Sequence, residues 1–477
     1  MHTSSTAPPH RHEPPGAALP RPRWALVLLC LAQFMLIVDL TVVNVALPSI
    51  AADLSLGRGA QTWVVTAYSL CFGGLLLLGG RLADTLGRRR AFLIGLALFT
   101  AASLLSGLAW DAGTLIGARA AQGVGAALLS PAALAIVTTS FHGPERTRAL
   151  GVWAAIGGTG AAAGVLLGGL LTSGPGWEWV FYVNVPAGLA VLAALPRAVP
   201  AAAPARRPLD LAGAATATLA AAALIYGLVT AGERGWGSGQ AFVPLGAAAV
   251  LAAAFLLVER SVRTPLVPPG LLRRRTIAAG NLLMLAASGL LLSGFFLISQ
   301  YLQNLLDYSA VKTGLVFLPV ALATIAGAHT ASTLAGRAGP RPVAAAGLAL
   351  AAAGAFLLSR LPADGNALTG VLPGFVLLAA GLGAAFVCAT ATAMNGISHD
   401  EAGLASGVVS TGHEIGGALG IALATALAGA SVGGQAVGGF HTAFAVFAGI
   451  GAAGAVLALL LVPAGRPDPG DGPVFAH

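Results

Sequence analysis

Charged side chains are too scarce in this sequence to cover the surface of a water-soluble protein. Only 9% of the 477 residues are charged, while 57% are hydrophobic. Soluble globular domains carry about 25% charged residues. The composition therefore excludes a soluble enzyme, a nucleic-acid-binding protein and a disordered chain, and it predicts a protein that is embedded in a lipid bilayer.

The hydrophobic residues are gathered into runs that are long enough to cross a bilayer. A spanning helix needs about 20 mostly apolar residues, because each residue advances the helix by about 1.5 Å through about 30 Å of hydrocarbon. About fourteen such runs are found, near 24–50, 62–80, 91–109, 113–140, 151–172, 178–196, 209–231, 241–259, 276–303, 313–336, 342–361, 370–393, 404–430 and 442–463. We therefore predict an all-α polytopic membrane protein with about 14 transmembrane helices and short loops.

The positions of the basic residues orient these helices. Twenty of the 25 lysine and arginine residues fall in alternate loops, four fall in the opposite loops, and Arg119 lies inside a span. Cytoplasmic loops are enriched in lysine and arginine. We therefore expect a multi-pass protein of the cytoplasmic membrane with both termini in the cytoplasm. Residues 1–23 are predicted to form a disordered cytosolic tail, and residues 464–477 a second cytosolic tail.

A degenerate internal repeat divides the chain into two halves. The segment GGRLADTLGRRR at residues 79–90 is echoed by TLAGRAGPR at residues 333–341. Transporters are commonly built from such repeats, with the substrate site near the middle of the membrane between them. We predict two six-helix bundles, at residues 24–196 and 276–463, with two inserted helices at residues 209–259.

Five motifs follow one another in order along nearly the whole chain. They are IVDLTVVNVALPSI (37–50), GGRLADTLGRRR (79–90), LIGARAAQGVGAALLSPAAL (115–134), WEWVFYVNVPAG (177–188) and YLQNLLDYSAVKTGLVFLP (301–319). Together they resemble the motifs of the major facilitator superfamily, in its fourteen-helix drug:proton antiporter branch. The resemblance implies the major facilitator fold and a secondary active transporter, not an enzyme, with no cofactor. One position departs from the branch, because Val165 stands where its helix-five antiporter motif has proline, and this weakens the case for antiport.

Three ionisable residues lie well inside predicted spans and are candidates for proton coupling. Asp39 and Glu414 are the only two acids in such positions, and Arg119 lies in the fourth span. A charge inside the membrane is costly, so it needs water, protonation or a partner. Because arginine keeps its proton, we expect Arg119 to face a cavity or to pair with Asp39 or Glu414. A purely structural ion pair is the alternative interpretation.

Further polar residues and glycines are candidates for binding and movement. The candidates for the substrate cavity are Asn44, Gln122, Asn281, Gln300, Gln303 and Asn304. The resemblance implies a cytoplasmic gate made of Gly80, Asp84, Gly87 and Arg88, although these charges could serve topology alone. The helix-packing candidates are Gly160, Gly164, Gly168 and Gly169, with a second ridge at Gly412, Gly416 and Gly420. Such small-residue ridges let helices approach closely.

No metal site is predicted beside the acid of the thirteenth span. His413 is adjacent to Glu414 in the sequence. Neighbouring positions on a helix point about 100° apart, so the two side chains are not expected to share a metal. We expect Glu414 to contact a cationic substrate or to serve as a second protonation site, or else to be a polar residue tolerated beside the cavity.

The predicted function is proton-coupled efflux of amphipathic organic compounds or drugs by alternating access. Its expected partners are protons, a cationic or zwitterionic small-molecule substrate and the lipid bilayer, with no nucleic acid, and the protein is expected to be a monomer. A transporter for one metabolite or one self-made antibiotic is the nearest alternative. A non-transporting sensor or a membrane enzyme is less favoured, because the sequence contains no Walker A, HExxH or GxSxG motif.

The arginine distribution yields a test of topology. Single cysteines at Gly235 and Arg274, in a variant without other cysteines, should react with a membrane-impermeant maleimide from outside and from inside the cell respectively. The reverse pattern of labelling would contradict the predicted orientation.

Overall fold

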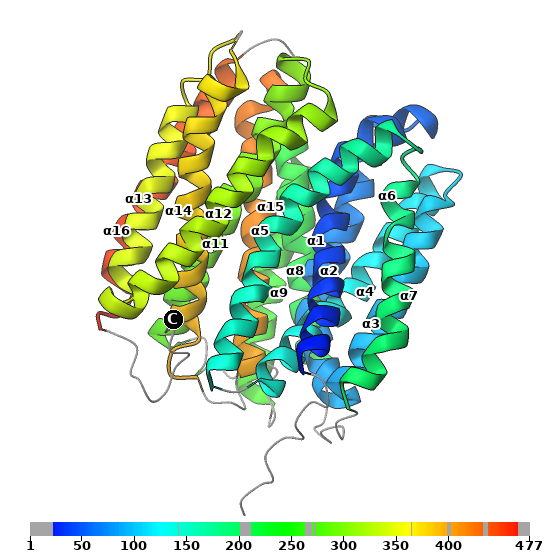
Figure 1. Ribbon diagram of the computed structural model, residues 1–477, viewed down its shortest axis with the longest axis vertical. Coiled ribbons are helices and arrows are strands. Elements are labelled where there is room, and N and C mark those ends of the chain that lie inside the picture. Colours follow the sequence, from blue (N-terminus) through cyan, green and yellow to red (C-terminus); the bar gives the residue numbers. More distant parts are fainter. Residues whose placement is uncertain are drawn as a thin grey trace, which may run out of the picture.

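The chain forms one bundle of long helices that run side by side (Figure 1). The computed structural model describes residues 22–141, 143–200, 211–262, 270, 273–363, 365–397, 402–432 and 437–465. Within these ranges the regular structure is helical and no strand occurs. The expected all-α fold is therefore confirmed. The predicted tails at residues 1–23 and 464–477 lie almost wholly outside the described residues.

The first half of the chain and the inserted segment supply nine of the helices. They are α1 (Pro22–Asp53), α2 (Arg58–Leu86), α3 (Arg88–Gly107), α4 (Ala112–Ser140), α5 (Gly143–Ser173), the short α6 (Trp179–Tyr182), α7 (Asn184–Ala198), α8 (Leu211–Arg234) and α9 (Gly239–Ser261).

In the part of the second half that the structure describes, there are six long helices and two π-helical turns. They are α11 (Arg275–Gln300) with the turn Tyr301–Leu305, α12 (Ala310–Ala338), α13 (Pro340–Leu358), the turn Ala367–Val371 with α14 (Leu372–Ala393), α15 (Ala402–Val432) and α16 (Gly438–Leu461).

Twelve helices in the described part of the chain are long and apolar enough to cross a membrane. The helices α5 and α15 are each 31 residues long, but they are not among these twelve. The predicted number of fourteen is therefore established only in part. The helix bounds differ from the predicted spans chiefly in α5, which begins at Gly143 and not near residue 151.

The predicted span 178–196 is interrupted, and the interruption has a local cause. A turn at Val183 separates α6 from α7. Pro186 has no N–H to donate to the carbonyl of Tyr182, so the regular hydrogen-bond ladder cannot continue through this point. As a result, Asn184 begins a new helix inside the bundle.

Close contacts between helices occur where glycines lie. On α4, a Cβ atom at Gly125 would lie 2.6 Å from the backbone nitrogen of Phe99 in α3. The ridge Gly160, Gly164 and Gly168 of α5 lies against α1, and the ridge Gly412, Gly416 and Gly420 of α15 lies against α11. Small residues at such crossings let the backbones pack directly against each other.

The two halves meet along two seams. At one seam α5 packs against α12, and at the other α2 packs against α15. The inserted helix α8 packs against both α2 and α15, while α9 packs on α8. Across this junction Trp63 of α2 stacks on Tyr226 of α8, with ring centroids 5.6 Å apart. The insertion therefore covers the second seam.

The start of α4 is fixed by a capping box. The Asp111 carboxylate accepts a hydrogen bond from the backbone N–H of Thr114 at 2.7 Å, and the Thr114 hydroxyl lies 3.3 Å from the backbone N–H of Asp111. These reciprocal bonds satisfy N–H groups that a helix start leaves unpaired. Hydrogen bonding to the Thr114 backbone and hydroxyl holds the pKa of Asp111 below its usual range.

The glycine contacts yield a test of packing. Replacing Gly125 by alanine should lower the free energy of unfolding by about 1–3 kcal/mol, because the added Cβ overpacks the α3–α4 contact. The measurement is the midpoint of thermal unfolding of the purified protein in detergent. Gly117→Ala on the same helix is the control, because no atom lies within 4 Å of the added Cβ there. Equal midpoints for the two variants would argue against the close approach of α3 and α4.

Candidate functional site

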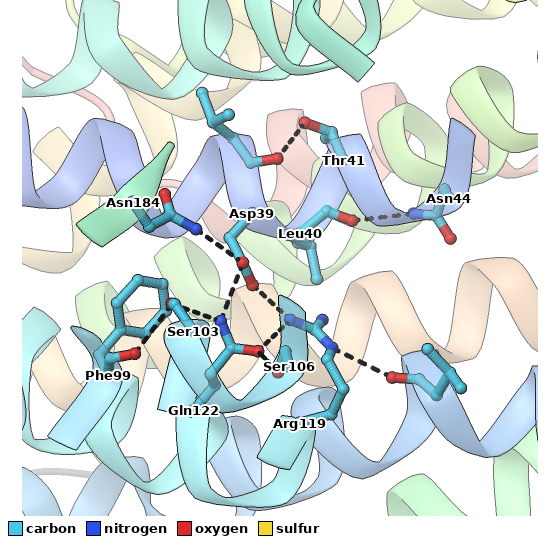
Figure 2. A network of polar contacts seen from close by, with 12 residues as sticks. Asp39, Leu40, Thr41, Asn44, Phe99, Ser103, Ser106, Arg119, Gln122 and Asn184 are labelled. Atoms are coloured by element: carbon cyan, nitrogen blue, oxygen red, sulfur yellow. Dashed lines mark hydrogen bonds and ion pairs between the residues drawn. The ribbon is translucent and has the colours of Figure 1, made fainter. Parts of the chain in front are cut away.

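An ion pair is enclosed within the first bundle. Nη1 of Arg119 on α4 lies 2.5 Å from Oδ2 of Asp39 on α1, and both side chains are fully buried. Figure 2 shows the two side chains pointing toward each other from facing helices. Of the two partners that the sequence allowed for Arg119, the structure selects Asp39.

The second oxygen of the carboxylate is also held. Oδ1 of Asp39 accepts one hydrogen bond from Nε2 of Gln122 and another from Nδ2 of Asn184, each at 3.0 Å. Asn184 is the first residue of α7, where the chain restarts after the turn at Val183. The helix interruption therefore positions an amide against the carboxylate, and three helices fix its orientation (Figure 2).

Gln122 joins the ion pair to α3. Its carbonyl oxygen accepts from Nη1 of Arg119 at 2.9 Å and from the Ser106 hydroxyl at 3.1 Å. Its amide also donates to the Ser103 hydroxyl at 2.7 Å, which in turn donates to the carbonyl of Phe99 at 2.8 Å. Both serines are buried. Polar groups on α3 thus keep the glutamine, and through it the ion pair, in one orientation.

The rest of the guanidinium meets the backbone and two aromatic rings. Nε of Arg119 donates to the carbonyl of Val64 at 3.2 Å. Its Cζ lies 4.4 Å from the ring centroid of Tyr68 and 5.8 Å from that of Phe181. Within the described residues, Nη2 of Arg119 and the hydroxyl of Tyr68 have no hydrogen-bond partner.

The buried pair joins one group whose charge can change to one whose charge cannot. Asp39 is the member of the pair that can change charge, since arginine remains protonated in proteins. A carboxylate is favoured beside a cation and disfavoured when it is desolvated alone. Removing one member of a buried pair costs about 3–5 kcal/mol, so the two charges constrain each other strongly.

Glu414 lies apart from this ion pair, on the facing surface of the second half. A Cβ atom at Gly73 of α2 would lie 3.5 Å from Cβ of Glu414, which places this residue at the α2–α15 seam. Nδ1 of His413 lies 3.3 Å from Oε1 of Glu414, so the two adjacent side chains do approach each other. No group of three residues that could hold a metal occurs in the part of the chain that the structure describes.

The candidates for the substrate cavity are not gathered in one place. Gln122 is fully buried in the network around Asp39. Asn281 of α11 faces Gly412 of α15, and its Oδ1 has no partner within the described ranges. Asn44 is exposed and donates to the carbonyl of Leu40 at 3.0 Å.

The remaining three candidates lie together at the end of α11. Gln303 donates to the Ser299 hydroxyl and Asn304 donates to Oε1 of Gln300, each at 2.8 Å. Both of these hydrogen bonds stay within one helical segment. The three residues lie at the end of α11, whereas a site between the bundles would be expected near the middle of this helix.

The predicted gate lies where α2 ends and α3 begins. Gly87 separates the two helices with a φ of 87°, a conformation that favours glycine. Arg88 follows as the first residue of α3. A Cβ atom at Gly80 would lie 3.7 Å from Pro131 of α4. The side chain of Asp84 lies outside the described residues.

Sequence reasoning missed several members of the network around Asp39. Asn184, Ser103, Ser106 and Tyr68 were not singled out, although all four are buried. A signal for Asn184 was present, since it is a polar residue within an apolar span and within the motif WEWVFYVNVPAG. The serines and the tyrosine carry no such signal, because these residue types are common in membrane helices.

The fold is a bundle of apolar helices that encloses a hydrogen-bonded ion pair. This is the architecture of a polytopic membrane protein with charged groups in its core, and comparison with known proteins identifies its family. The family model of the Major Facilitator Superfamily matches residues 29–421 and 295–475. The puromycin resistance protein of Streptomyces alboniger is 44% identical over 408 residues, which is 84% of this chain and 80% of that protein. The cephamycin export protein of Amycolatopsis lactamdurans is 42% identical over 403 residues, covering 83% and 82% respectively.

A solved structure supports the fold independently of these close sequences. The human organic anion transporter TETRAN is similar with a TM-score of 0.61, covering 92% of this chain and 100% of that chain at 17% identity. The chain belongs to the Major Facilitator Superfamily. It is a multi-pass membrane transporter of small molecules, and the expected resemblance to drug-efflux members is confirmed.

The ion pair yields a test by double substitution. Arg119→Gln should destabilise the protein by about 3–5 kcal/mol, because it leaves the Asp39 carboxylate buried without its cation. Adding Asp39→Asn should restore most of that loss. The measurement is thermal unfolding of both single variants and the double variant.

Exposed Arg360 provides a matched control. Arg360→Gln should change the free energy of unfolding by less than about 0.5 kcal/mol. If the losses from Arg119→Gln and Asp39→Asn simply add, the two side chains do not depend on each other.

Proposed function

We propose that the protein exports amphipathic organic compounds across the cytoplasmic membrane in exchange for protons, by alternating access. The observation that carries this proposal is the buried Asp39–Arg119 pair, in which one member can titrate and the other cannot. Ionisable residues inside membranes mark ion and substrate pathways in transporters. The drug-export and resistance roles named for the relatives support an outward direction of transport.

The proposed coupling uses the two environments that Asp39 can occupy. When α1 and α4 lie as in this structure, Arg119, Gln122 and Asn184 all stabilise the ionised carboxylate. When these contacts are broken in a dry site, the protonated form is favoured. One proton crossing 100 mV supplies about 2.3 kcal/mol, which supports a substrate gradient of about 40-fold.

We propose that the chain has the fourteen membrane spans that the sequence predicts. We assign α5 and α15 as spans in addition to the twelve that qualify by length and composition, which gives fourteen with both termini in the cytoplasm. The alternation of arginine-rich loops supports this orientation. Gly80, Asp84, Gly87 and Arg88 then lie at the cytoplasmic mouth, where we assign them to the gate between inward-facing and outward-facing states.

The substrate is proposed to lie between the two halves. Glu414 lies beside α2 of the first half, and its carboxylate would attract a cationic group, while Asn281 lies between α11 and α15 of the second half. Asn44 and the residues at the end of α11 are assigned to its path of exit. We propose that the protein works as a monomer, since one chain already joins its two halves through a shared apolar core, in which Val45 and Val165 pack with residues of the second half.

A transporter dedicated to one antibiotic is the second candidate. It is favoured by two of the relatives, whose names each refer to a single antibiotic, puromycin or cephamycin. Both candidates share the same coupling site and differ only in the breadth of substrates. Expression in a host that lacks its own efflux pumps, followed by a survey of toxic compounds, separates them, because broad resistance supports multidrug export and resistance to one class supports dedicated export.

The role of Asp39 is tested by substitution with asparagine. Asp39→Asn mimics the protonated state permanently, so the variant should bind substrate but lose gradient-driven uptake into inverted vesicles by at least about tenfold. Substrate-induced proton release from the detergent-solubilised protein should disappear as well. Downhill exchange of substrate is expected to persist.

Asp111→Asn is the matched control, because asparagine is as good a helix cap as aspartate and the residue is exposed. This variant should retain uptake close to that of the wild type. Full gradient-driven uptake by Asp39→Asn would move the coupling role to another residue, with Glu414 as the first candidate.

A further inference from the structure

Arg119 lies between two aromatic rings as well as beside its carboxylate. The ring of Tyr68 on α2 is the nearer, at 4.4 Å from Cζ, and the ring of Phe181 on α6 is at 5.8 Å. Arg119 and Phe181 are fully buried, and Tyr68 is 1% exposed. Both rings are therefore in the distance range of a cation–π contact, in a place from which water is largely excluded.

The two rings contribute most to the stabilisation of the Arg119 charge when Asp39 carries a proton. In the ionised state the charge of Arg119 is balanced by the carboxylate at 2.5 Å. When a proton from solution binds to Oδ2 of Asp39, that balance is lost, and the guanidinium keeps its full charge because it cannot release its own proton. The carbonyl of Val64 and the amide oxygen of Gln122 remain as acceptors, but neither carries a charge.

We propose that Tyr68, assisted by Phe181, stabilises the charge of Arg119 while Asp39 is protonated, and thereby sets the pH at which the transporter takes up and releases its proton. The negative face of an aromatic ring attracts a cation without being able to bind a proton itself. The ring thus favours the loaded state without competing for the proton. This role is a positioning role, because Tyr68 acts through Arg119, and it rests on the proposed proton coupling.

Among the described residues, α15 places a further acid near this site. Glu414 and His413 of α15 lie across α2, and Tyr68 is within electrostatic reach of Asp39, Arg119 and Glu414. The described α5 residues recorded against α1 are glycines and apolar side chains such as Leu167 and Leu171, and α7 contributes the neutral Asn184. Tyr182 of α6 donates its hydroxyl to the carbonyl of Gly107 and is thereby engaged elsewhere.

The experiment separates the ring of Tyr68 from its hydroxyl and from its packing. Tyr68→Leu removes the ring, while Tyr68→Phe keeps the ring and removes only the hydroxyl. Phe181→Leu removes the more distant ring. Phe72→Leu is the packing control, since Phe72 is buried on the same helix with its ring 5.8 Å from that of Tyr68.

Two readouts follow the proton on Asp39. The first is the infrared band of the protonated carboxyl group, titrated with pH in the purified protein and assigned by its loss in Asp39→Asn. The second is the pH dependence of substrate-induced proton release. The infrared band reports protonation whether or not transport occurs, so it tests the role of the ring separately from the proposed function.

Tyr68→Leu should shift the midpoint of the Asp39 titration to lower pH by about half a unit to one and a half units, because the ring offsets the charge of Arg119 more strongly when the carboxylate no longer does so. Phe181→Leu should give a smaller shift in the same direction. Tyr68→Phe and Phe72→Leu should leave the midpoint within about 0.2 units of the wild type, since neither removes a ring that contacts Arg119.

Equal shifts for Tyr68→Leu and Phe72→Leu, or an unshifted Tyr68→Leu titration, would overturn the inference. A shift for Tyr68→Phe as large as that for Tyr68→Leu would also overturn it, by assigning the effect to the hydroxyl. Absence of proton release in the wild type, with the infrared shifts as expected, would reject proton coupling while leaving the contact between ring and charge intact.

Discussion

A positive charge that cannot be neutralised lies inside a membrane helix of this protein, and much of the first bundle is arranged around it. Arg119 is fully buried, so the free-energy cost of burying its charge must be offset by partners within the protein and not by water. Those partners come from four helices: Asp39 from α1, a carbonyl and a ring from α2, Gln122 from its own helix and a second ring from α6. Each helix must therefore keep its depth and rotation for the charge to remain satisfied.

Two local features of the sequence bring these partners together. Glycines on α4 allow its backbone to approach α2 and α3 closely, as at Gly123 beside the Tyr68 carbonyl and at Gly125 beside Phe99. Asn184 at the start of α7 donates its amide to Asp39. The Trp177 indole N–H fixes the loop before α6 by donating to Asp53 at the end of α1, at 3.0 Å. Close packing and one broken helix thus place three polar side chains around one carboxylate.

The helical fold could be predicted from the sequence because the membrane imposes one dominant rule. Every backbone polar group in hydrocarbon must be satisfied internally, so runs of about 20 apolar residues become helices. The pairing of Arg119 with Asp39 could be predicted only in part, because the sequence offered two acids, and only the spatial arrangement excludes Glu414. Ser103, Ser106 and Tyr68 could not be identified, since their importance depends on which way α3 and α2 face. The interruption at Val183 was also missed, although Pro186 gives it a simple cause.

The dispersal of the predicted cavity residues has a similar explanation. Gln300, Gln303 and Asn304 are polar residues close together in the sequence, which suggested a shared binding surface. In the structure their amides bond along their own helical segment. Polarity indicates that a residue needs a hydrogen bond, but it does not indicate whether a ligand or the same helix supplies the partner.

The position of α8 makes the two seams of the molecule unequal toward the surrounding lipid. At the seam between α2 and α15, α8 stands on the outside and is backed by α9. Small residues line its contact with α2, since a Cβ atom at Gly74 would lie 3.5 Å from that of Ala222. An apolar molecule dissolved in the bilayer would therefore meet α8 and α9 before it reached this seam. At the seam between α5 and α12 the inserted helices do not intervene. The inserted helices therefore cover one of the two seams, so a lateral opening toward the lipid at the α2–α15 seam would require α8 and α9 to move.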